Sequence, residues 1–193
     1  MNSLQRILIA DYDVHHGNGT QDAFYHDPAV LFASTHQYPY YPGTGSISET
    51  GTGAGKGCTL NMPLPAGTGN AGFELLYERV LWPAARRFKP DLVMVSAGFD
   101  AHWSDPLAML QLDLAGYSHL TRELIRMAQG LCGGRIVFVT EGGYDLDVLA
   151  HGVLNVAYAL QGAEIISDPV GPMEMPGHDT TPLVEQLLRL HGL

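Results

Sequence analysis

Hydrophobic positions along the chain gather into short, nearly continuous runs that are rich in β-branched residues. Runs of about four to eight such residues are typical of strands buried on both faces of a parallel sheet. Between and after these runs, apolar residues recur at the spacing of one buried helix face. We predict strands at Arg6–Ala10, Val30–Ser34, Thr59–Leu64, Asp91–Ser96 and Arg135–Thr140.

Helical spacing follows the later runs. Strands that alternate with helices indicate an α/β fold of three layers, α/β/α, with a mainly parallel sheet in the middle. The 193 residues are enough for one such domain, residues 1–193, and short for two. The predicted helices lie at Ala71–Phe88, at Leu114–Leu131, between Tyr144 and Leu160, and near Thr181–Leu190.

Charge and cysteine content narrow the function classes. Ten Lys and Arg against 20 Asp and Glu give a formal charge of −10, which repels phosphate backbones, so we expect no direct nucleic-acid binding. An acidic surface suits cationic substrates such as lysine peptides or polyamines. The two cysteines, Cys58 and Cys132, form neither a disulfide framework nor a cysteine zinc site. No apolar run reaches the roughly 18 residues of a membrane span, so we expect a cytoplasmic protein without membrane association.

Residues with metal-binding side chains, and glycines, directly follow four of the predicted strands. In open parallel sheets, ligands bind at the edge formed by the carboxyl ends of the strands. One site assembled from several loops is therefore predicted there. The segments are Asp11–Gly17 (DYDVHHG), Ser34–His36 (STH), Ala97–His102 (AGFDAH) and Glu141–Asp145 (EGGYD).

The first of these segments alternates acidic and imidazole side chains. Residues two apart in an extended chain project to the same side, so Asp11, Asp13 and His15 share a face. Two carboxylates that point together repel each other unless a cation lies between them. Oxygen and nitrogen ligands suit zinc, and Asp100 from another strand end could supply a third ligand, which would leave one position for water. The alternative is that Asp11 and Asp13 cap the following helix while His15 lies on the surface.

A glycine-rich segment, Gly51–Gly57 (GTGAGKG), does not fit a phosphate-binding loop. Thr50 stands where the first glycine is required, and Gly57 follows Lys56 where Ser or Thr is needed. The segment is part of a long predicted loop, Tyr38–Gly57, and loops of that length are often functional.

Four segments, taken together, resemble the histone deacetylase family, nearest its class II and bacterial members. They occur in the family's order and cover most of the chain up to about Gly162. The resemblance implies an arginase/deacetylase-like fold and zinc-dependent hydrolysis of an acyl-amine amide, as in protein deacetylases or acetylpolyamine amidohydrolases. The segments are DYDVHHGNGTQDAFYHDPAVLFASTH (Asp11–His36), PYYPGTG (Pro39–Gly45), SAGFDAHWSDPL (Ser96–Leu107) and EGGYDLDVLA (Glu141–Ala150).

The resemblance also implies metal-binding roles. Asp13, His15 and Asp100 match the family's zinc ligands. Asp11 and Ser34 match side chains that hold a structural potassium ion beside the zinc. Zinc and potassium are therefore the expected cofactors.

Substrate-binding roles follow in the same way. Tyr144 matches the tyrosine that hydrogen-bonds the carbonyl oxygen of the acyl group. Tyr41, Leu107 and Gly142 match walls of a narrow channel that takes the acyl-lysine stem. The expected substrate is an acylated lysine peptide, a polyamine or a small acyl-amine.

One departure concerns the general base. Family members carry a tandem histidine pair well before the zinc strand, but this chain begins ten residues before Asp11. His15 cannot replace that pair because it is needed as a ligand, and Asp11 and Asn18 match positions that orient the pair. We therefore expect an N-terminally truncated domain that holds zinc but deacylates poorly by itself. An exposed sheet edge would favour self-association or a complementing N-terminal segment.

Two other functions stay open. One is a non-catalytic zinc-binding or interaction domain derived from a deacetylase. The other is an arginase-like di-metal hydrolase, which needs further ligands near Asp13, with His102 the only candidate. We interpret His36 as a packed or hydrogen-bonded loop residue and His151 as structural, and we place His102 at the channel mouth or on the surface.

Overall fold

The sheet of the computed structural model has five parallel strands in the order β3-β2-β1-β4-β5. The structure describes residues 4–193, so the start of the predicted domain 1–193 lies outside the described residues. Each predicted strand is present, and the predicted parallel α/β sheet is confirmed. The strands are β1 (Ile7–Asp11), β2 (Val30–Gln37), β3 (Thr59–Leu64), β4 (Leu92–Ala97) and β5 (Ile136–Thr140).

Strand β2 extends beyond its predicted end. We predicted that it stops at Ser34, but it continues to Gln37 because β3 goes on pairing with it, with His36 opposite Pro63 and Gln37 opposite Leu64. The polar residues after Ser34 hid this part of the strand in the hydrophobic pattern. The other strands begin and end within one residue of the predicted bounds.

The predicted helix at Ala71–Phe88 is a single rod with a wide turn inside it. The Trp82 N–H donates to the Tyr77 carbonyl oxygen, which is the spacing of a π-helical turn. Pro83 explains this turn, because proline lacks an N–H and its ring crowds the carbonyl four residues earlier. The helical segments are α1 (Asn18–Phe24), the 3₁₀ turn η1 (Gly53–Gly55), α2 (Asn70–Leu76), the π turn η2 (Tyr77–Leu81), α3 (Trp82–Phe88), α4 (Leu114–Cys132), α5 (Leu146–Leu160) and α6 (Thr181–His191).

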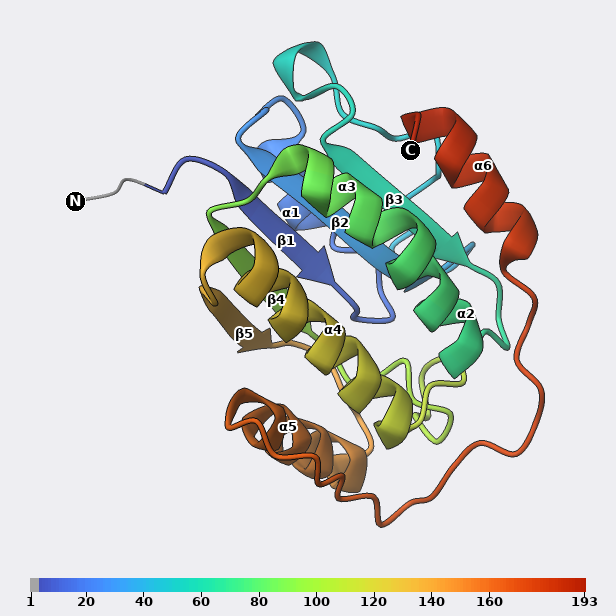
Figure 1. The fold of residues 1–193 in the computed structure, drawn as a ribbon. Coiled ribbons are helices and arrows are strands. Elements are labelled where there is room, and N and C mark those ends of the chain that lie inside the picture. The colour runs from blue at the N-terminus through green and yellow to red at the C-terminus, as the bar shows by residue number, and fades with distance from the viewer. Residues whose placement is uncertain (1–3) are drawn as a thin grey trace.

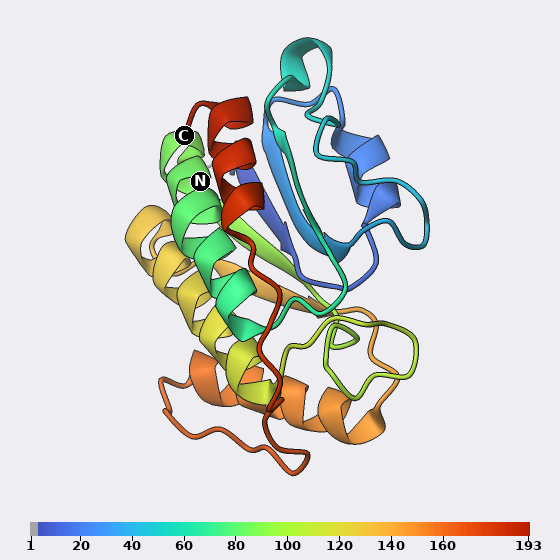
Figure 2. The ribbon, with the colours of Figure 1, turned by 90° about the vertical axis from the view of Figure 1, so that its right-hand side faces the viewer.

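Helices lie on both sides of the sheet, but unevenly. Helices α2, α3, α4 and α6 lie together on one face, whereas α1 lies on the other face beside β1 and β2 (Figures 1 and 2). Helix α5 lies beyond the β5 edge and packs against α4. None of the helices in the described part of the chain has both the length and the apolarity of a membrane span.

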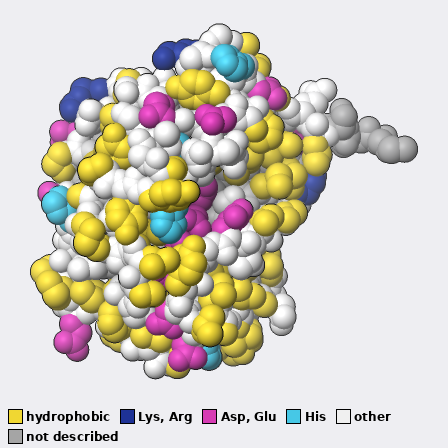
Figure 3. Space-filling view, turned by 180° about the vertical axis from the view of Figure 1, so that it is seen from behind, with side chains coloured by type: hydrophobic (Ala, Val, Ile, Leu, Met, Phe, Trp, Pro, Cys, Tyr) yellow, Lys and Arg dark blue, Asp and Glu magenta, His cyan; other side chains and the backbone are white. Residues whose placement is uncertain are grey.

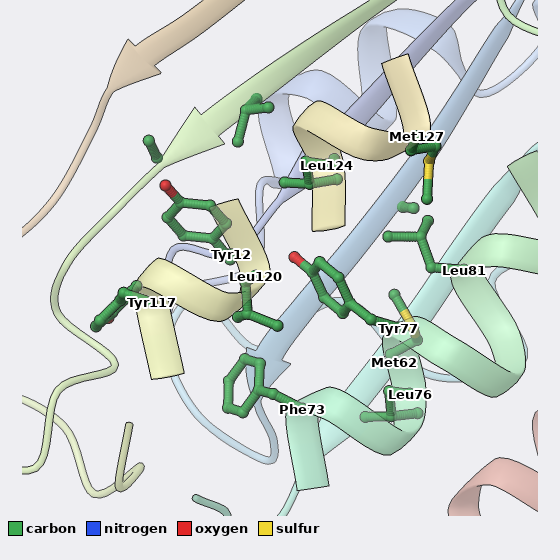
Figure 4. Close-up of a cluster of buried hydrophobic side chains, with 14 of the residues drawn as sticks. Tyr12, Met62, Phe73, Leu76, Tyr77, Leu81, Tyr117, Leu120, Leu124 and Met127 are labelled. Atoms are coloured by element: carbon green, nitrogen blue, oxygen red, sulfur yellow. The ribbon is translucent and has the colours of Figure 1, made fainter. Parts of the chain in front are cut away.

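The main hydrophobic core fills the space between the sheet and the helical face formed by α2, α3 and α4 (Figure 4). Tyr12, which directly follows β1, is fully buried there and meets Phe99 and Tyr117 edge-on, with ring centroids 6.2 and 5.7 Å away. Val14 is fully buried in the same core. These buried side chains anchor the loop after β1, which carries the predicted metal ligands.

The opposite face of the sheet is apolar and open over its β4–β5 side. Met94 of β4 pairs in register with Val137 of β5, and Val139 lies two residues further along the same face. Val137 and Val139 are 47% and 43% exposed, so no element within residues 4–193 covers them. We call the surface of Met94, Val137 and Val139 the open face. It lies next to the outer edge of β5, where the sequence predicts exposed apolar surface.

Candidate metal centre

Asp13, His15 and Asp100 form a compact cluster at the carboxyl edge of the sheet. His15 Nδ1 lies 3.2 Å from Asp13 Oδ1 and 3.1 Å from Asp100 Oδ2. Ligand atoms from all three residues lie within 4.8 Å of one another. Tetrahedral zinc with bonds of about 2.1 Å separates its ligand atoms by about 3.4 Å. The described residues therefore fit a zinc ion in both donor type and spacing.

Two turns after β1 position this cluster. The Asp11 carboxylate accepts the Asp13 N–H at 3.0 Å, and the Asp13 carboxylate accepts the His15 N–H at 2.8 Å. Such Asx turns fix the backbone two residues ahead of each aspartate. Because Tyr12 and Val14 point into the core, the ligand side chains point the other way, as the predicted alternation requires.

The capping alternative for Asp11 and Asp13 is wrong. Helix α1 begins at Asn18 and has no side-chain cap, and Gly17 occupies its N-cap position. Both carboxylates are instead engaged in their own turns. Asp13 also faces His15 directly, so that histidine is part of the cluster and not an isolated surface residue.

Backbone N–H groups hold the other carboxylate oxygens. Gly142 N–H donates to Asp13 Oδ2 and Val14 N–H donates to Asp100 Oδ1, both at 2.9 Å. The approach at Gly142 requires glycine, because a Cβ there would lie 2.3 Å from Asp100 Oδ2. A Cβ on Gly98 would lie 2.3 Å from Asp13 Oδ2. The two glycines let the backbone close tightly around the ligand carboxylates.

Electrostatics at the cluster favour a bound positive charge. Burial raises the pKa of Asp100, which has no exposed surface, and burial together with Asp13 raises the pKa of Asp11 well above its usual range. Donating hydrogen bonds to Asp100, and then to Asp13, raises the pKa of His15 to about 10. A proton on His15 therefore relieves the repulsion between the carboxylates, and a metal cation would relieve it in the same way.

Asp13 and His15 of the cluster line a pocket of about 460 Å³, whereas Asp100 is fully buried. Tyr41, Leu107, Gly142 and Tyr144 all line it, so every predicted substrate-binding residue shares this pocket with Asp13 and His15. Tyr41, Leu107 and Tyr144 are 74%, 47% and 50% exposed. Figure 3 shows acidic side chains and a histidine within a hollow that hydrophobic side chains surround. Asn18, matched in sequence to a histidine-orienting position, also lines the pocket.

Asp11 and Ser34, the predicted potassium ligands, are neighbours across β1 and β2 in the strand register. Both are buried. The Ser34 hydroxyl lies 2.9 Å from His36 Nδ1. Asp11 lines the pocket, whereas Ser34 does not line it. The pair thus combines a carboxylate and a hydroxyl oxygen next to the candidate zinc ligands.

His36 is packed and hydrogen-bonded, as predicted, but it belongs to strand β2 and not to a loop. Its Nε2 donates to the Gly45 carbonyl oxygen at 2.9 Å, and burial lowers its pKa to about 3. His16 packs against it with ring centroids 4.7 Å apart, and His16 is bound by Thr44 and Gln21. This network attaches the long loop Tyr38–Gly57 to the sheet.

The prediction for His102 is wrong. This side chain is fully buried and lies neither at a channel mouth nor on the surface, because it turns inward and its Nδ1 lies 2.9 Å from Ser104 Oγ. His151 lies in α5 and contacts Ser167 Oγ at 2.7 Å, which agrees with a structural role. Within residues 4–193, Asp13, His15 and Asp100 form the one cluster with metal-ligand spacing, so the second ligand set of an arginase-like site is lacking there.

Sequence reasoning missed two residues beside the pocket. Asp105 is buried, and its carboxylate accepts backbone N–H groups from Leu107 and Tyr144. Tyr40 stacks on the His15 ring at 6.0 Å and donates its hydroxyl to the Leu107 carbonyl oxygen. Only the proximity of Tyr40 to Tyr41 and of Asp105 to Leu107 in the sequence could have drawn attention to them.

The fold and the site together define a parallel α/β protein with an Asp–His–Asp cluster at the carboxyl edge of its sheet. Comparisons with known proteins place this arrangement in a family. The family model described as "Histone deacetylase domain" matches residues 1–160 of the chain. The chain belongs to the histone deacetylase family.

Individual relatives agree. The chain is 45% identical to "Histone deacetylase 10, chloroplastic" of Oryza sativa subsp. japonica, over all of this chain and 44% of that protein. It is 51% identical to "Histone deacetylase 14, chloroplastic" of Arabidopsis thaliana, over 86% of this chain and 39% of that protein. A solved structure of the histone deacetylase Clr3 superposes with a TM-score of 0.85 at 38% identity, over 97% of this chain and 32% of that one. The chain thus spans less than half the length of these relatives.

Proposed function

We propose that this chain carries the metal-binding part of a zinc-dependent deacylase that hydrolyses the amide of an acylated amine. The observation that carries the proposal is the close grouping of Asp13, His15 and Asp100 at a pocket that Asp13, His15 and Tyr144 line. Zinc held by these residues would polarise the amide carbonyl and make bound water acidic enough to attack near neutral pH. Asp11 and Ser34 are proposed to hold potassium next to it.

Tyr144 is proposed to bind the acyl carbonyl oxygen. Its side chain is half exposed in the pocket, and its backbone is fixed by the hydrogen bond to Asp105. Desolvation first, and then the charge of Asp100, raise the pKa of Tyr144. The phenol therefore keeps its proton at neutral pH and can donate to the oxygen that becomes negative during attack. Losing one such donor typically lowers the rate about 10²–10³-fold.

The pocket walls favour a linear, partly apolar substrate stem. Tyr41 and Leu107 lie at the rim with their side chains exposed, and the Tyr41 ring stands edge-on to His15 at 5.9 Å. An acylated lysine has a methylene stem that can lie between such side chains. The net charge of −10 would attract the cationic remainder of a lysine peptide or a polyamine.

General acid–base catalysis is the weak part of this site. His15 is a proposed ligand, and the ring of His16 is already bonded to Thr44 and Gln21. The pocket formed by residues 4–193 therefore offers no free imidazole to move the proton. Since general acid–base assistance contributes typically about 10²–10⁴-fold, we propose that turnover by these residues alone is low.

Metal analysis and an assay on an acetyl-lysine peptide test the proposal together. We expect the purified chain to bind one zinc ion and to show slow turnover. Tyr144→Phe should lower that turnover about 10²-fold or more without reducing the zinc content. Equal rates for the two proteins would contradict the role of Tyr144. Zinc binding with no turnover at all would favour the non-catalytic alternative.

A further inference from the structure

Two loops of the pocket meet at one buried carboxylate, that of Asp105. Its side chain belongs to a residue that is only 6% exposed. Asp105 Oδ1 accepts the Leu107 N–H and Asp105 Oδ2 accepts the Tyr144 N–H, each at 2.9 Å. One oxygen therefore holds the loop after β4, and the other holds the loop after β5.

These two bonds matter because the side chains that they position have little else to fix them. Leu107 and Tyr144 are about half exposed, so core packing does not determine where they stand. Their backbone is irregular, outside any helix or strand. The direction of each side chain into the pocket therefore depends on its backbone, which the Asp105 carboxylate holds.

Two neighbouring contacts tie the same loops together. We call these two contacts and the two Asp105 hydrogen bonds the clamp. The Tyr40 hydroxyl donates to the Leu107 carbonyl oxygen, so the Leu107 backbone is bound on both sides. The Ser104 hydroxyl donates to Asp145 Oδ2 at 2.6 Å, which joins the same two loops one residue away. Three loops, those carrying Tyr40, Leu107 and Tyr144, are thus tied around the pocket.

We infer that Asp105 is a positioning residue that sets the substrate channel by fixing Leu107 and Tyr144, an inference that rests on the proposed deacylase function. Hydrogen bonds to a charged group contribute about 1.5–3 kcal/mol, which corresponds to roughly tenfold or more in a local equilibrium. Asp105→Asn removes the charge and presents an NH₂ group to one of the two N–H donors. At least one of the two loops should then be released.

The first measurement is amide hydrogen exchange followed by NMR. Asp105→Asn should speed exchange at Leu107, at Tyr144 or at both by about tenfold or more, while the amides of Val14 and Gly142, held by ligand carboxylates, stay unchanged. Asp113→Asn is the matched control. Asp113 is 5% exposed and its carboxylate accepts the Gly116 N–H, but it caps α4 away from the pocket.

The second measurement separates positioning from a purely structural role. The zinc-loaded protein is titrated with acetohydroxamate, which is too short to reach the rim, and with a linear six-carbon alkyl hydroxamate. Asp105→Asn should leave zinc affinity unchanged and weaken the long hydroxamate about tenfold, and more than the short one. Equal affinities of wild type and Asp105→Asn for both hydroxamates would overturn the inference.

Tyr40→Phe provides an independent variant if Asp105→Asn does not fold. It keeps the ring that stacks on His15 and removes only the hydroxyl bound to Leu107. It should weaken the long hydroxamate several-fold and leave the short one unchanged, and an unchanged long hydroxamate would count against the clamp. A zinc-loaded wild type that binds neither hydroxamate would instead refute the proposed function, and with it any functional role of the clamp.

Discussion

The face of the sheet that carries α1 is well covered over β2 and β3 but open over β4 and β5. Over β2 and β3, helix α1 and the loop Tyr38–Gly57 leave Phe32 at 1% and Asn61 at 0% exposure. Over β4 and β5, Val137 and Val139 stand open to solvent. The candidate site crosses this boundary, since His15 follows β1 whereas Tyr144 follows β5. Asp13 and His15 therefore follow a well-covered part of the sheet, whereas Leu107 and Tyr144 of the channel wall depend on a few loop hydrogen bonds.

The largest effect is expected at the metal ligands. Asp100→Asn keeps the size of this fully buried side chain but removes a charged ligand. Zinc affinity should therefore fall by more than about 100-fold, which exceeds the loss typical of mutating a residue that only hydrogen-bonds a metal ligand. Competition titration against a chelating dye measures the change. Asp113→Asn, with similar burial, should bind zinc like the wild type, and equal loss in both variants would mean that folding, not ligation, was damaged.

A matched pair of valines sharpens the contrast between the two faces. Val93 is fully buried on the helical face, and Val137 is 47% exposed on the open face. Val93→Ala should lower the free energy of unfolding by about 2–3 kcal/mol, because it removes buried methyl groups and leaves a cavity. Val137→Ala should cost less than about 1 kcal/mol. Urea denaturation measures both, and similar costs would show that the open face is covered in solution.

Zinc affinity should depend on pH. The pKa of His15 is raised to about 10 in the folded, metal-free chain, so this imidazole is protonated at neutral pH and zinc must displace the proton. The apparent affinity should then fall about tenfold for each pH unit below 10. The stability of the metal-free fold should change with pH in the opposite direction to zinc affinity. The protonated His15 stabilises the fold fully below about pH 6.5, and this contribution is lost as pH rises through 10. Calorimetry of zinc binding in two buffers of different ionisation enthalpy counts the released proton. If zinc binding releases no proton, His15 does not carry the proton that its hydrogen bonds to Asp13 and Asp100 are expected to hold.

The smallest effect concerns association through the open face. We propose that its apolar surface and the β5 edge favour self-association or a complementing segment. Val139→Lys places a charge there and should lower the tendency to associate a few-fold with little change in zinc binding. Sedimentation velocity over a concentration series measures this, with Leu154→Lys on helix α5, 37% exposed, as the control. Association unchanged by Val139→Lys would exclude the open face.

The features that the sequence predicts well are those with a repeating or local signal. Buried parallel strands are continuously apolar, and their carboxyl ends meet at one edge, so Asp13 and Asp100 could be placed together before any geometry was known. Helix α1 was missed because only Gln21 is buried among its seven residues, which leaves no apolar stripe. The role of Asp105 was missed because a carboxylate that accepts backbone N–H groups has no periodic signature.

The bond from the Val14 N–H to Asp100 joins residues that are 86 positions apart. A nascent chain cannot make it until β4 has been synthesised and has docked beside β1, so the half of the site contributed by β1 waits for a distant partner. Zinc uptake would consequently report that this long-range closure has happened, since a site absent from the unfolded chain couples metal affinity to folding.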